Sequence, residues 1–241
     1  MKLLRSLTLV LASGLLASPV LADLQPYSQD FESMDQSSPT ALSDDGWLIF
    51  ANVFNPDLSY AYGYGVFPAP NGTGGFSNVA VGEGGVDQGA QQLVTFSDYL
   101  NGDHANGLII ESNVFQEFTV GAADVGSTWT FEFDAKLGDI QSPSTAKAFI
   151  KTLDPNNGYA LTNFVTLDTH TLPTTWGTYS IQLAVDSSLQ GQIFQIGFLN
   201  NATNYDPSGV FYDNINFFTP EPASLALLGL GGLVVLRRRK S

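Results

Sequence analysis

The chain has 241 residues, a formal net charge of −14 and no cysteine, and only 13% of its residues are charged, which argues against a coiled coil or a long charged helix. Six of the nine basic residues lie at the two chain ends, and only one of the 23 acidic residues, Glu221, lies outside residues 23–219. The central region 23–219 therefore has three lysines against 22 carboxylates, which gives it a charge of −19. A region without arginine and with so few lysines cannot neutralise phosphate groups, and we therefore expect no nucleic-acid binding.

Residues 1–22 have the three features of a secretory signal peptide. Lys2 and Arg5 form a positive N-terminal region, an apolar run extends from Leu7 to Leu16, and the small residue Ala22 ends a cleavage site. The alternative is an N-terminal membrane anchor, but the apolar run is shorter than the ~20 residues that a spanning helix needs. We therefore expect an exported protein that folds without disulfide bonds.

Residues 23–219 are predicted to form one all-β domain. Short segments alternate between apolar and polar residues, Gly, Pro, Asn and Asp separate them, and no helical period extends over ten residues. The predicted strands are 28–33, 47–53, 60–67, 91–97, 107–120, 129–134, 145–153, 159–167, 179–185, 192–199 and 209–217. About eleven strands in a region of this length are typical of a two-sheet antiparallel β-sandwich with a jelly-roll path. The glycine-rich stretch 71–90 is predicted to be a long surface loop.

Four segments resemble parts of jelly-roll carbohydrate-binding modules and galactose-binding-like domains. They are the opening around Phe31-Glu32, the strand 127–136, the Trp176-Gly-Thr-Tyr179 strand opening, and the closing strand Val210-Phe-Tyr-Asp-Asn-Ile-Asn216. The pair Phe31-Glu32 followed by Gly46-Trp47 also resembles the opening of extracellular adhesin-like domains. The first resemblance extends through roughly the C-terminal half of the chain and implies a sandwich that binds carbohydrate.

The same resemblance implies a structural calcium ion. In the resembled domains a calcium clips the first strand to the last through two carboxylates, and the corresponding residues here are Glu32 and Asp213. Calcium takes six to eight oxygen ligands, and it would offset the repulsion between carboxylates brought together in a strongly acidic domain. Asp30 and Asp45 are further candidate ligands. The alternative is that Glu32 and Asp213 are solvated carboxylates at strand ends.

Tyr60, Tyr62 and Tyr64 are spaced two residues apart and are expected to share one face of a strand. Aromatic rings a pleat apart suit stacking on sugar rings, so the three tyrosines and Trp47 are candidate glycan ligands. The alternative is that these rings pack in the core or along a sheet edge. Trp176 is expected to be a packing residue.

Catalytic chemistry has little support in the sequence. His104 and His170 are the only histidines and are far apart in the chain, which disfavours a zinc site, and no Gly-x-Ser-x-Gly motif is present. Glu132 and Asp134 share one side of a predicted strand and are expected to form a solvated face.

Residues 220–241 form a three-part C-terminal segment. Pro220, Glu221 and Pro222 precede the apolar run 223–236, and the basic cluster that follows includes Arg237, Arg238 and Arg239. As a helix the run would be about 21 Å long, which is short against a hydrocarbon core of about 30 Å. The order of the three parts resembles the PEP-CTERM sorting signal. That resemblance implies transient insertion of 223–236 in the inner membrane, recognition by an exosortase, and release to the cell surface or extracellular matrix. The alternative is a plain C-terminal membrane anchor.

The sequence thus predicts an exported, non-catalytic surface or matrix protein that binds a neutral polysaccharide and is associated with exopolysaccharide or biofilm. Two alternatives stay open. One is a structural or adhesive surface protein without a sugar site, and the other, less favoured, is a glycan lyase or hydrolase on the same scaffold.

Overall fold

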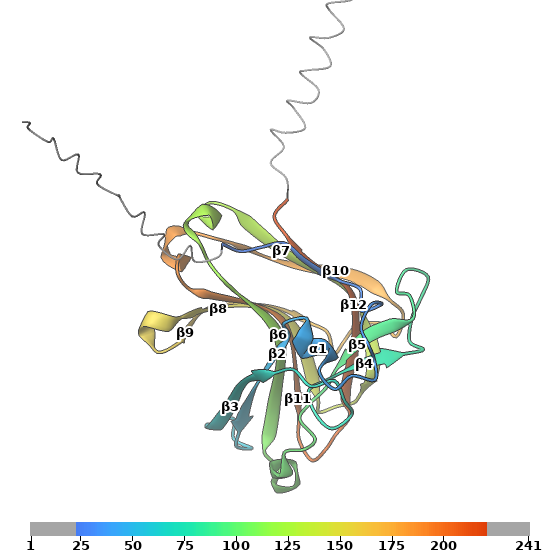
Figure 1. Cartoon of the computed structure of the whole chain (residues 1–241). Helices are drawn as coiled ribbons and strands as arrows, with labels where there is room; N and C mark the ends of the chain where they lie inside the picture. The colour runs from blue at the N-terminus through green and yellow to red at the C-terminus, as the bar shows by residue number, and fades with distance from the viewer. Residues whose placement is uncertain (1–22, 221–241) are drawn as a thin grey trace, which may run out of the picture.

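The alternating segments of the sequence form two antiparallel sheets that pack face to face in the computed structural model, which describes residues 23–220 (Figure 1). Sheet A contains, in spatial order, β10 (Gly177–Ala184), β7 (Thr128–Ile140), β12 (Ser208–Phe218), β5 (Gln91–Thr95) and β4 (Ser77–Val81), and β1 (Tyr27–Gln29) pairs with β12. Sheet B contains β3 (Tyr60–Pro68), β2 (Leu48–Phe54), β6 (Ile109–Thr119), β11 (Ile193–Ala202), β8 (Thr145–Asp154) and β9 (Ala160–Asp168). The helical segments are α1 (Ala41–Asp44) and the 3-10 turns η1 (Gly102–Asn106), η2 (Ala122–Asp124), η3 (Pro155–Asn157) and η4 (Ser187–Leu189).

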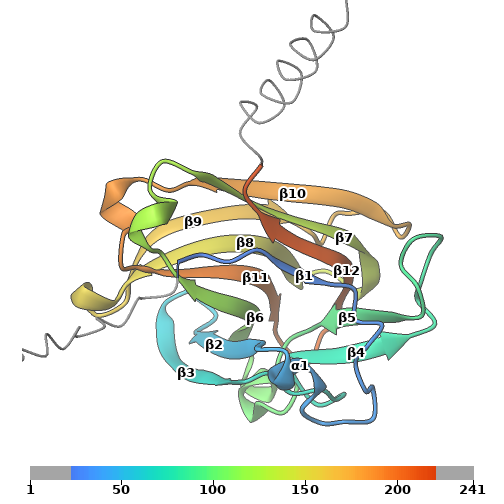
Figure 2. The same ribbon diagram turned by 45° about the horizontal axis from the view of Figure 1, so that its top comes forward.

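The first and last strands of the domain lie side by side. β1 pairs with the C-terminal part of β12, with Tyr27 opposite Phe217 and Gln29 opposite Ile215 (Figure 2). This pairing brings the residues that follow β1 next to the middle of β12. The position of the candidate calcium ligands follows from it.

The space between the sheets is filled by aromatic rings. Phe198 of sheet B stacks on Tyr212 of sheet A with the ring centroids 3.5 Å apart. Phe131 and Phe133 of sheet A also contact the Phe198 ring. Trp47 is completely buried here and stacks on Phe198 at 6.5 Å. The prediction that Trp47 is a glycan ligand is therefore wrong: its side chain is part of the core, because it directly precedes a strand whose alternate residues face sheet A.

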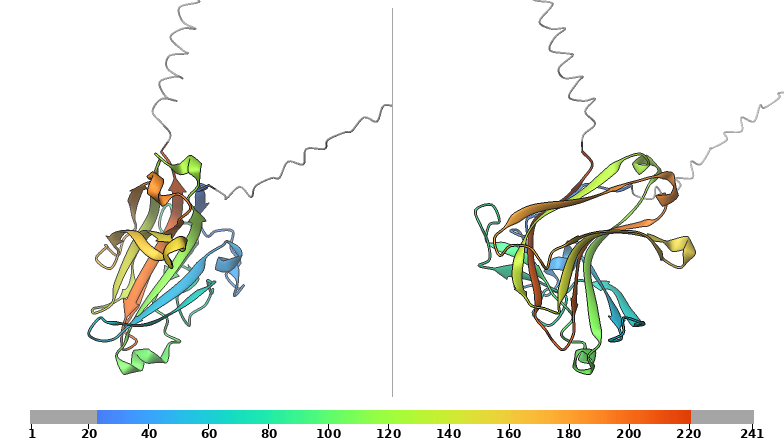
Figure 3. Two further views of the ribbon diagram at one scale, coloured as in Figure 1. Left: turned by 90° about the vertical axis from the view of Figure 1, so that its left-hand side faces the viewer. Right: turned by 180° about the vertical axis from the view of Figure 1, so that it is seen from behind.

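Sheet B has a second face that points away from sheet A, which we call the free face (Figure 3). Along β11, Phe194, Ile196 and Phe198 enter the core, whereas the residues between them face outward. The free face carries a small hydrophobic cluster of its own, in which Phe115, Phe149 and Leu199 are buried against Leu48 and Phe50.

The predicted two-sheet, all-β sandwich is confirmed. Each predicted strand has a counterpart, but β4, at Ser77–Val81, lies inside the stretch 71–90 that was expected to be a loop. Flanking glycines obscured this short apolar alternation in the sequence. Some predictions concern residues outside the described range. They are those for residues 1–22, the run 223–236, and Glu221, Pro222, Arg237, Arg238 and Arg239.

Candidate functional site

The three tyrosines of β3 do not share one face. Tyr62 lies opposite Val53, but a bulge at Ala61 then places Phe54, rather than Asn55, in register with Tyr60. Tyr62 and Tyr64 therefore point to the inner side of the sheet edge together with Val53. Tyr60 points to the free face, where its ring meets Phe54 edge-on at a centroid distance of 6.0 Å. The expected row of three rings is wrong, because a bulge adds one residue to the period of two.

Tyr62 and Tyr64 form what we call the tyrosine platform. Their rings are stacked with centroids 6.1 Å apart and an interplanar angle of 30°. Tyr64 packs edge-on against Phe76 and is partly buried, whereas Tyr62 is 38% exposed. The platform therefore joins the core at one ring and faces solvent at the other.

The polar loop 98–103, which we call the platform loop, fixes both hydroxyl groups of the platform. The Tyr62 hydroxyl donates to Oδ2 of Asp103, and the Tyr64 hydroxyl donates to Oδ2 of Asp98, each at 2.6 Å. Nδ2 of Asn101 donates to both tyrosine oxygens, at 3.1 and 3.2 Å. Because each hydroxyl has a donor and an acceptor partner, the two rings are held in one orientation.

The loop itself is ordered by local hydrogen bonds. The Asn101 side chain caps η1 by accepting from the backbone N–H of Asp103, and Gly107 ends the turn in the left-handed conformation. Burial followed by the hydrogen bond to Asp103 raises the pKa of Tyr62, and the Tyr62 hydroxyl in turn lowers the pKa of Asp103. At neutral pH the tyrosines are thus neutral donors and the carboxylate is charged.

The second candidate region surrounds Asp213, in the centre of sheet A. Its Oδ1 accepts from the N–H of Asn214, but its buried Oδ2 has no hydrogen-bond partner. Burial raises the pKa of Asp213 to about 7, with further contributions from the charges of Asp134, Glu32 and Asp30. These four carboxylates, Asp30, Glu32, Asp134 and Asp213, are called the acidic cluster below.

Of the other three predicted calcium ligands, Glu32 and Asp30 lie close enough to Asp213 to affect its pKa, whereas Asp45 bonds a different group. Glu32 belongs to the acidic cluster, and its Oε1 accepts from the N–H groups of Ala90 and Gln91, at 2.7 and 2.6 Å. Asp30 is exposed and acts on Asp213 through its charge. Asp45 is occupied elsewhere, because its Oδ2 accepts from the Tyr27 hydroxyl at 2.5 Å. Within residues 23–220 no group of three or more His, Cys, Asp or Glu side chains is arranged to hold a metal ion.

Asp134 was expected on a solvated face but is buried. It lies directly across from Asp213 in the β7–β12 register, and its carboxylate accepts from Gln88, Asn214 and Thr178 at 2.6–2.8 Å. The segment 82–90 folds over this part of sheet A. Sequence periodicity could not show that cover, since it reports the face of a strand and not what lies on that face.

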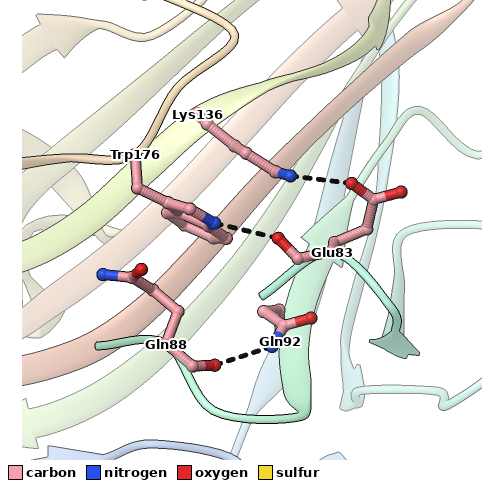
Figure 4. A network of polar contacts seen from close by, with 5 residues as sticks. All are labelled: Glu83, Gln88, Gln92, Lys136 and Trp176. Atoms are coloured by element: carbon pink, nitrogen blue, oxygen red, sulfur yellow. Dashed lines mark hydrogen bonds and ion pairs between the residues drawn. The ribbon is translucent and has the colours of Figure 1, made fainter. Parts of the chain in front are cut away.

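Segment 82–90 is anchored by the polar network drawn in Figure 4. Glu83 forms an ion pair with Lys136 at 2.7 Å, and its carbonyl accepts from Nε1 of Trp176 at 2.9 Å. Farther along, the carbonyl of Gln88 accepts from Nε2 of Gln92. The Lys136 ammonium also lies 5.3 Å from the Trp176 ring centroid. Trp176 thus holds the segment that covers Asp134.

A buried serine–histidine contact lies close to the platform loop. Oγ of Ser97 is 3.3 Å from Nε2 of His104, but Ser97 also bonds the Ile110 carbonyl and both side chains are completely buried. Nδ1 of His104 has no hydrogen-bond partner. A catalytic serine needs an accessible hydroxyl and an oriented histidine, so this contact does not form such a site.

Residues 218–240 match the PEP-CTERM protein-sorting motif. The motif implies export, handling by an exosortase, and a location at the cell surface or in the matrix. In the range 23–220 no helix combines the length and apolar character needed to cross a membrane. No curated protein matches the chain.

Three solved structures illustrate the similarity in fold. The enzymatically active domain of bacteriophage CBA120 tailspike protein 4 is 12% identical with a TM-score of 0.44, over 78% of this chain and 21% of that one. The CBM22-1 xylan-binding domain of Paenibacillus barcinonensis Xyn10C is 13% identical with a TM-score of 0.36, over 61% and 83%. The Stig cyclase Fisc from Fischerella sp. TAU is 14% identical with a TM-score of 0.46, over 81% and 98%. The chain thus spans about a fifth of the tailspike chain.

Proposed function

We propose that the exported domain is a non-catalytic module that binds a neutral polysaccharide of the extracellular matrix through the tyrosine platform. The observation that carries this proposal is the fixed pair of stacked rings, Tyr62 and Tyr64, bordered by Asp103 and Asn101. The C–H face of a sugar stacks on an aromatic ring, and carboxylate and amide groups beside the ring accept from and donate to sugar hydroxyls. Rings that are already oriented lose little conformational entropy on binding.

The charge of the domain favours a neutral ligand. The platform is bordered by Asp98 and Asp103, and the region 23–219 contains no arginine. An anionic polysaccharide would be repelled by these carboxylates at low ionic strength. A neutral polymer meets no such barrier. Association with exopolysaccharide or biofilm is part of this proposal, and the sorting motif supports it.

A structural or adhesive role is the second candidate, because β3 is an edge strand with an unusual surface. Its nine residues include no charged side chain, and Val66 and Phe67 are each about half exposed. Exposed edges of this type pair with other chains. Bulges between Ile49 and Phe50 and between Val53 and Phe54 disturb the register of this edge, which disfavours regular strand addition.

Binding of neutral oligosaccharides tests the proposal directly. The full chain is titrated by calorimetry with ligands selected on a glycan array. We expect Tyr62→Ala to weaken binding at least tenfold, since stacking contributes on the order of 1 kcal/mol or more per ring. Tyr60→Ala is the matched control, because this ring lies on the opposite side of the same strand and should leave the affinity unchanged. Equal affinities of the unmodified chain, Tyr62→Ala and Tyr60→Ala would exclude the tyrosine platform as the binding site. Release of reducing ends from a bound glycan would exclude a purely non-catalytic role.

We also propose that a calcium ion binds beside Asp213 and Glu32. The unpartnered buried Oδ2 of Asp213 and the surrounding charges of the acidic cluster fit a divalent cation. Two carboxylates do not complete the coordination of calcium, so backbone carbonyl groups and water would provide the remaining oxygens. The role would be structural, joining the segment after β1 to β12. Asp45 is not part of this proposal, because Tyr27 occupies its carboxylate.

A further inference from the structure

The free face of sheet B holds a lysine whose amine lies against an asparagine side chain. Lys151 of β8 lies opposite Gln195 of β11, and Asn113 of β6 lies opposite Leu199 of the same strand. Between them is Gly197, which has no side chain on this face. The lysine therefore reaches across β11, and its Nζ donates to Oδ1 of Asn113 at 2.5 Å.

Glycine is required at position 197 for close packing of the strands. A Cβ atom there would lie 2.2 Å from the Val114 carbonyl oxygen and 2.7 Å from the Phe115 Cα. These are backbone contacts that cannot yield without moving β6. The approach of β6, β11 and β8 that brings Nζ to the amide is thus set by the backbone.

The surroundings of the amine are apolar. Nζ of Lys151 is 4.2 Å from the centroid of Phe149, which is completely buried, and 5.0 Å from that of Phe164. Burial lowers the pKa of Lys151 to about 8, although the charge of Glu111 acts in the opposite direction. A sizeable fraction of the amine is therefore uncharged, and nucleophilic, slightly above neutral pH.

A carboxylate is held beside the amide. Oε1 of Glu111 accepts from Nδ2 of Asn113 at 3.3 Å and from Nδ2 of Asn52 at 2.8 Å. Glu111 is thus fixed next to the nitrogen that would leave if the amide were attacked. The amine of β8 and the amide of β6 thus meet across Gly197, and the carboxylate lies on the far side of the amide, opposite Asn201.

We propose that Lys151 and Asn113 join in an intramolecular isopeptide bond, with Glu111 as the proton-transfer group. The lone pair of Nζ attacks Cγ of Asn113, Glu111 takes the proton that Nζ loses and delivers it to Nδ2, and the Cγ–Nδ2 bond breaks. The lysine amine and the asparagine amide thereby become a secondary amide and one molecule of ammonia. No oxidant, metal or co-substrate takes part.

Such a bond would give this exported chain a covalent cross-link that does not depend on cysteine, which the chain lacks. It would connect two strands, β6 and β8, that are separated by β11 in sheet B. The cross-link is independent of glycan binding, since the tyrosine platform lies at the β3 edge and shares no residue with it.

Peptide mapping of the full chain tests the proposal. The folded protein is incubated at pH 8 and digested with trypsin and a glutamate-specific protease. We expect a linked pair of peptides that contains Asn113 and Lys151 and has the summed mass of both less one ammonia. Trypsin should fail to cleave after Lys151. Recovery of the two peptides only in unlinked form, from protein shown by circular dichroism to be folded, would overturn the proposal.

Variants test whether the link requires the amine of Lys151 and the carboxylate of Glu111. Lys147 lies on the same strand and face as Lys151 and pairs with Asp168 at 3.4 Å, so Lys147→Arg should retain the link. Lys151→Arg should abolish it. Glu111→Gln preserves the size of the side chain but cannot transfer the proton, and we expect linkage at least tenfold slower. Linkage in folded Glu111→Gln at the rate of the unmodified chain would overturn the role of Glu111.

Discussion

At the scale of single residues, Asp213 shows how a buried group can be unfavourable by itself and useful with a partner. Its Oδ2 has no hydrogen bond, and burial raises its pKa to about 7. A carboxyl whose pKa is raised by folding binds protons more tightly in the folded state than in the unfolded state. Its cost to stability is therefore absent below about pH 4, increases with pH, and is complete above about pH 7.

The first prediction concerns Asp213→Asn in the presence of a chelator. The variant removes the charge, so its free energy of unfolding should decrease less between pH 5 and pH 8 than that of the unmodified chain. Chemical denaturation at both pH values measures the difference. Asp35→Asn is the control, because Asp35 is exposed and hydrogen bonds from Ser37 lower its pKa. Parallel pH dependences of the unmodified chain and Asp213→Asn would refute this interpretation of Asp213.

Trp47 is a residue whose burial decides its role. It contacts Phe31 and Phe198 and is not exposed. We predict that Trp47→Ala lowers the free energy of unfolding by about 3–5 kcal/mol, the usual cost of deleting a large buried side chain. Under conditions where Trp47→Phe stays folded, its affinity for glycans should match that of the unmodified chain. A folded Trp47→Phe variant that no longer binds would return Trp47 to the site.

At the scale of elements, the proposed binding surface depends on the contact between β3 and the loop that leads into η1. Asn101 connects the two, because it bonds both tyrosine hydroxyls and caps η1. We predict that Asn101→Ala weakens glycan binding by roughly threefold to tenfold, as expected for the loss of about 1 kcal/mol of hydrogen bonding. Asn106→Ala, on the same turn, is the control: Asn106 contacts Asp103 but neither ring. The proposal fails if both variants bind equally well.

The strands could be predicted from the sequence, whereas the bulge in β3 and the platform residues outside the strands could not. Strand alternation predicted the two sheets, since Phe131 and Phe133 enter the core as their spacing suggests. It did not reveal the bulge that turns Tyr60 away from Tyr62, because a bulge depends on the register with β2. It also missed Asp98, Asn101 and Asp103, which belong to a loop without periodicity. A turn-forming run of Asp and Asn directly after a strand was the only signal for them.

The acidic cluster was only partly predictable for a related reason. The resemblance to jelly-roll modules pointed to Glu32 and Asp213, and the pairing of β1 with β12 brings their neighbourhoods together. Asp134 was missed because the segment 82–90 covers it. Such a contact between positions 88 and 134 is long-range and leaves no local pattern.

At the scale of the whole molecule, stability has to arise without disulfide bonds in a domain of high negative charge. Self-repulsion among carboxylates opposes folding, and a bound cation near Asp213 and Glu32 would reduce it. We predict that a chelator lowers the midpoint of thermal unfolding of the unmodified chain and that added calcium restores it. Asp213→Asn should lose this response. An identical midpoint with chelator and with calcium would contradict the calcium proposal.

The central claim is that a fixed aromatic platform on an exported sandwich recognises a neutral polysaccharide. Hydrogen exchange of the full chain, with and without a bound oligosaccharide, measures the contact surface most directly. The account predicts added protection in β3 and in residues 98–103, and unchanged exchange on the free face around Phe149. Protection confined to the free face, or absent from β3, would contradict it.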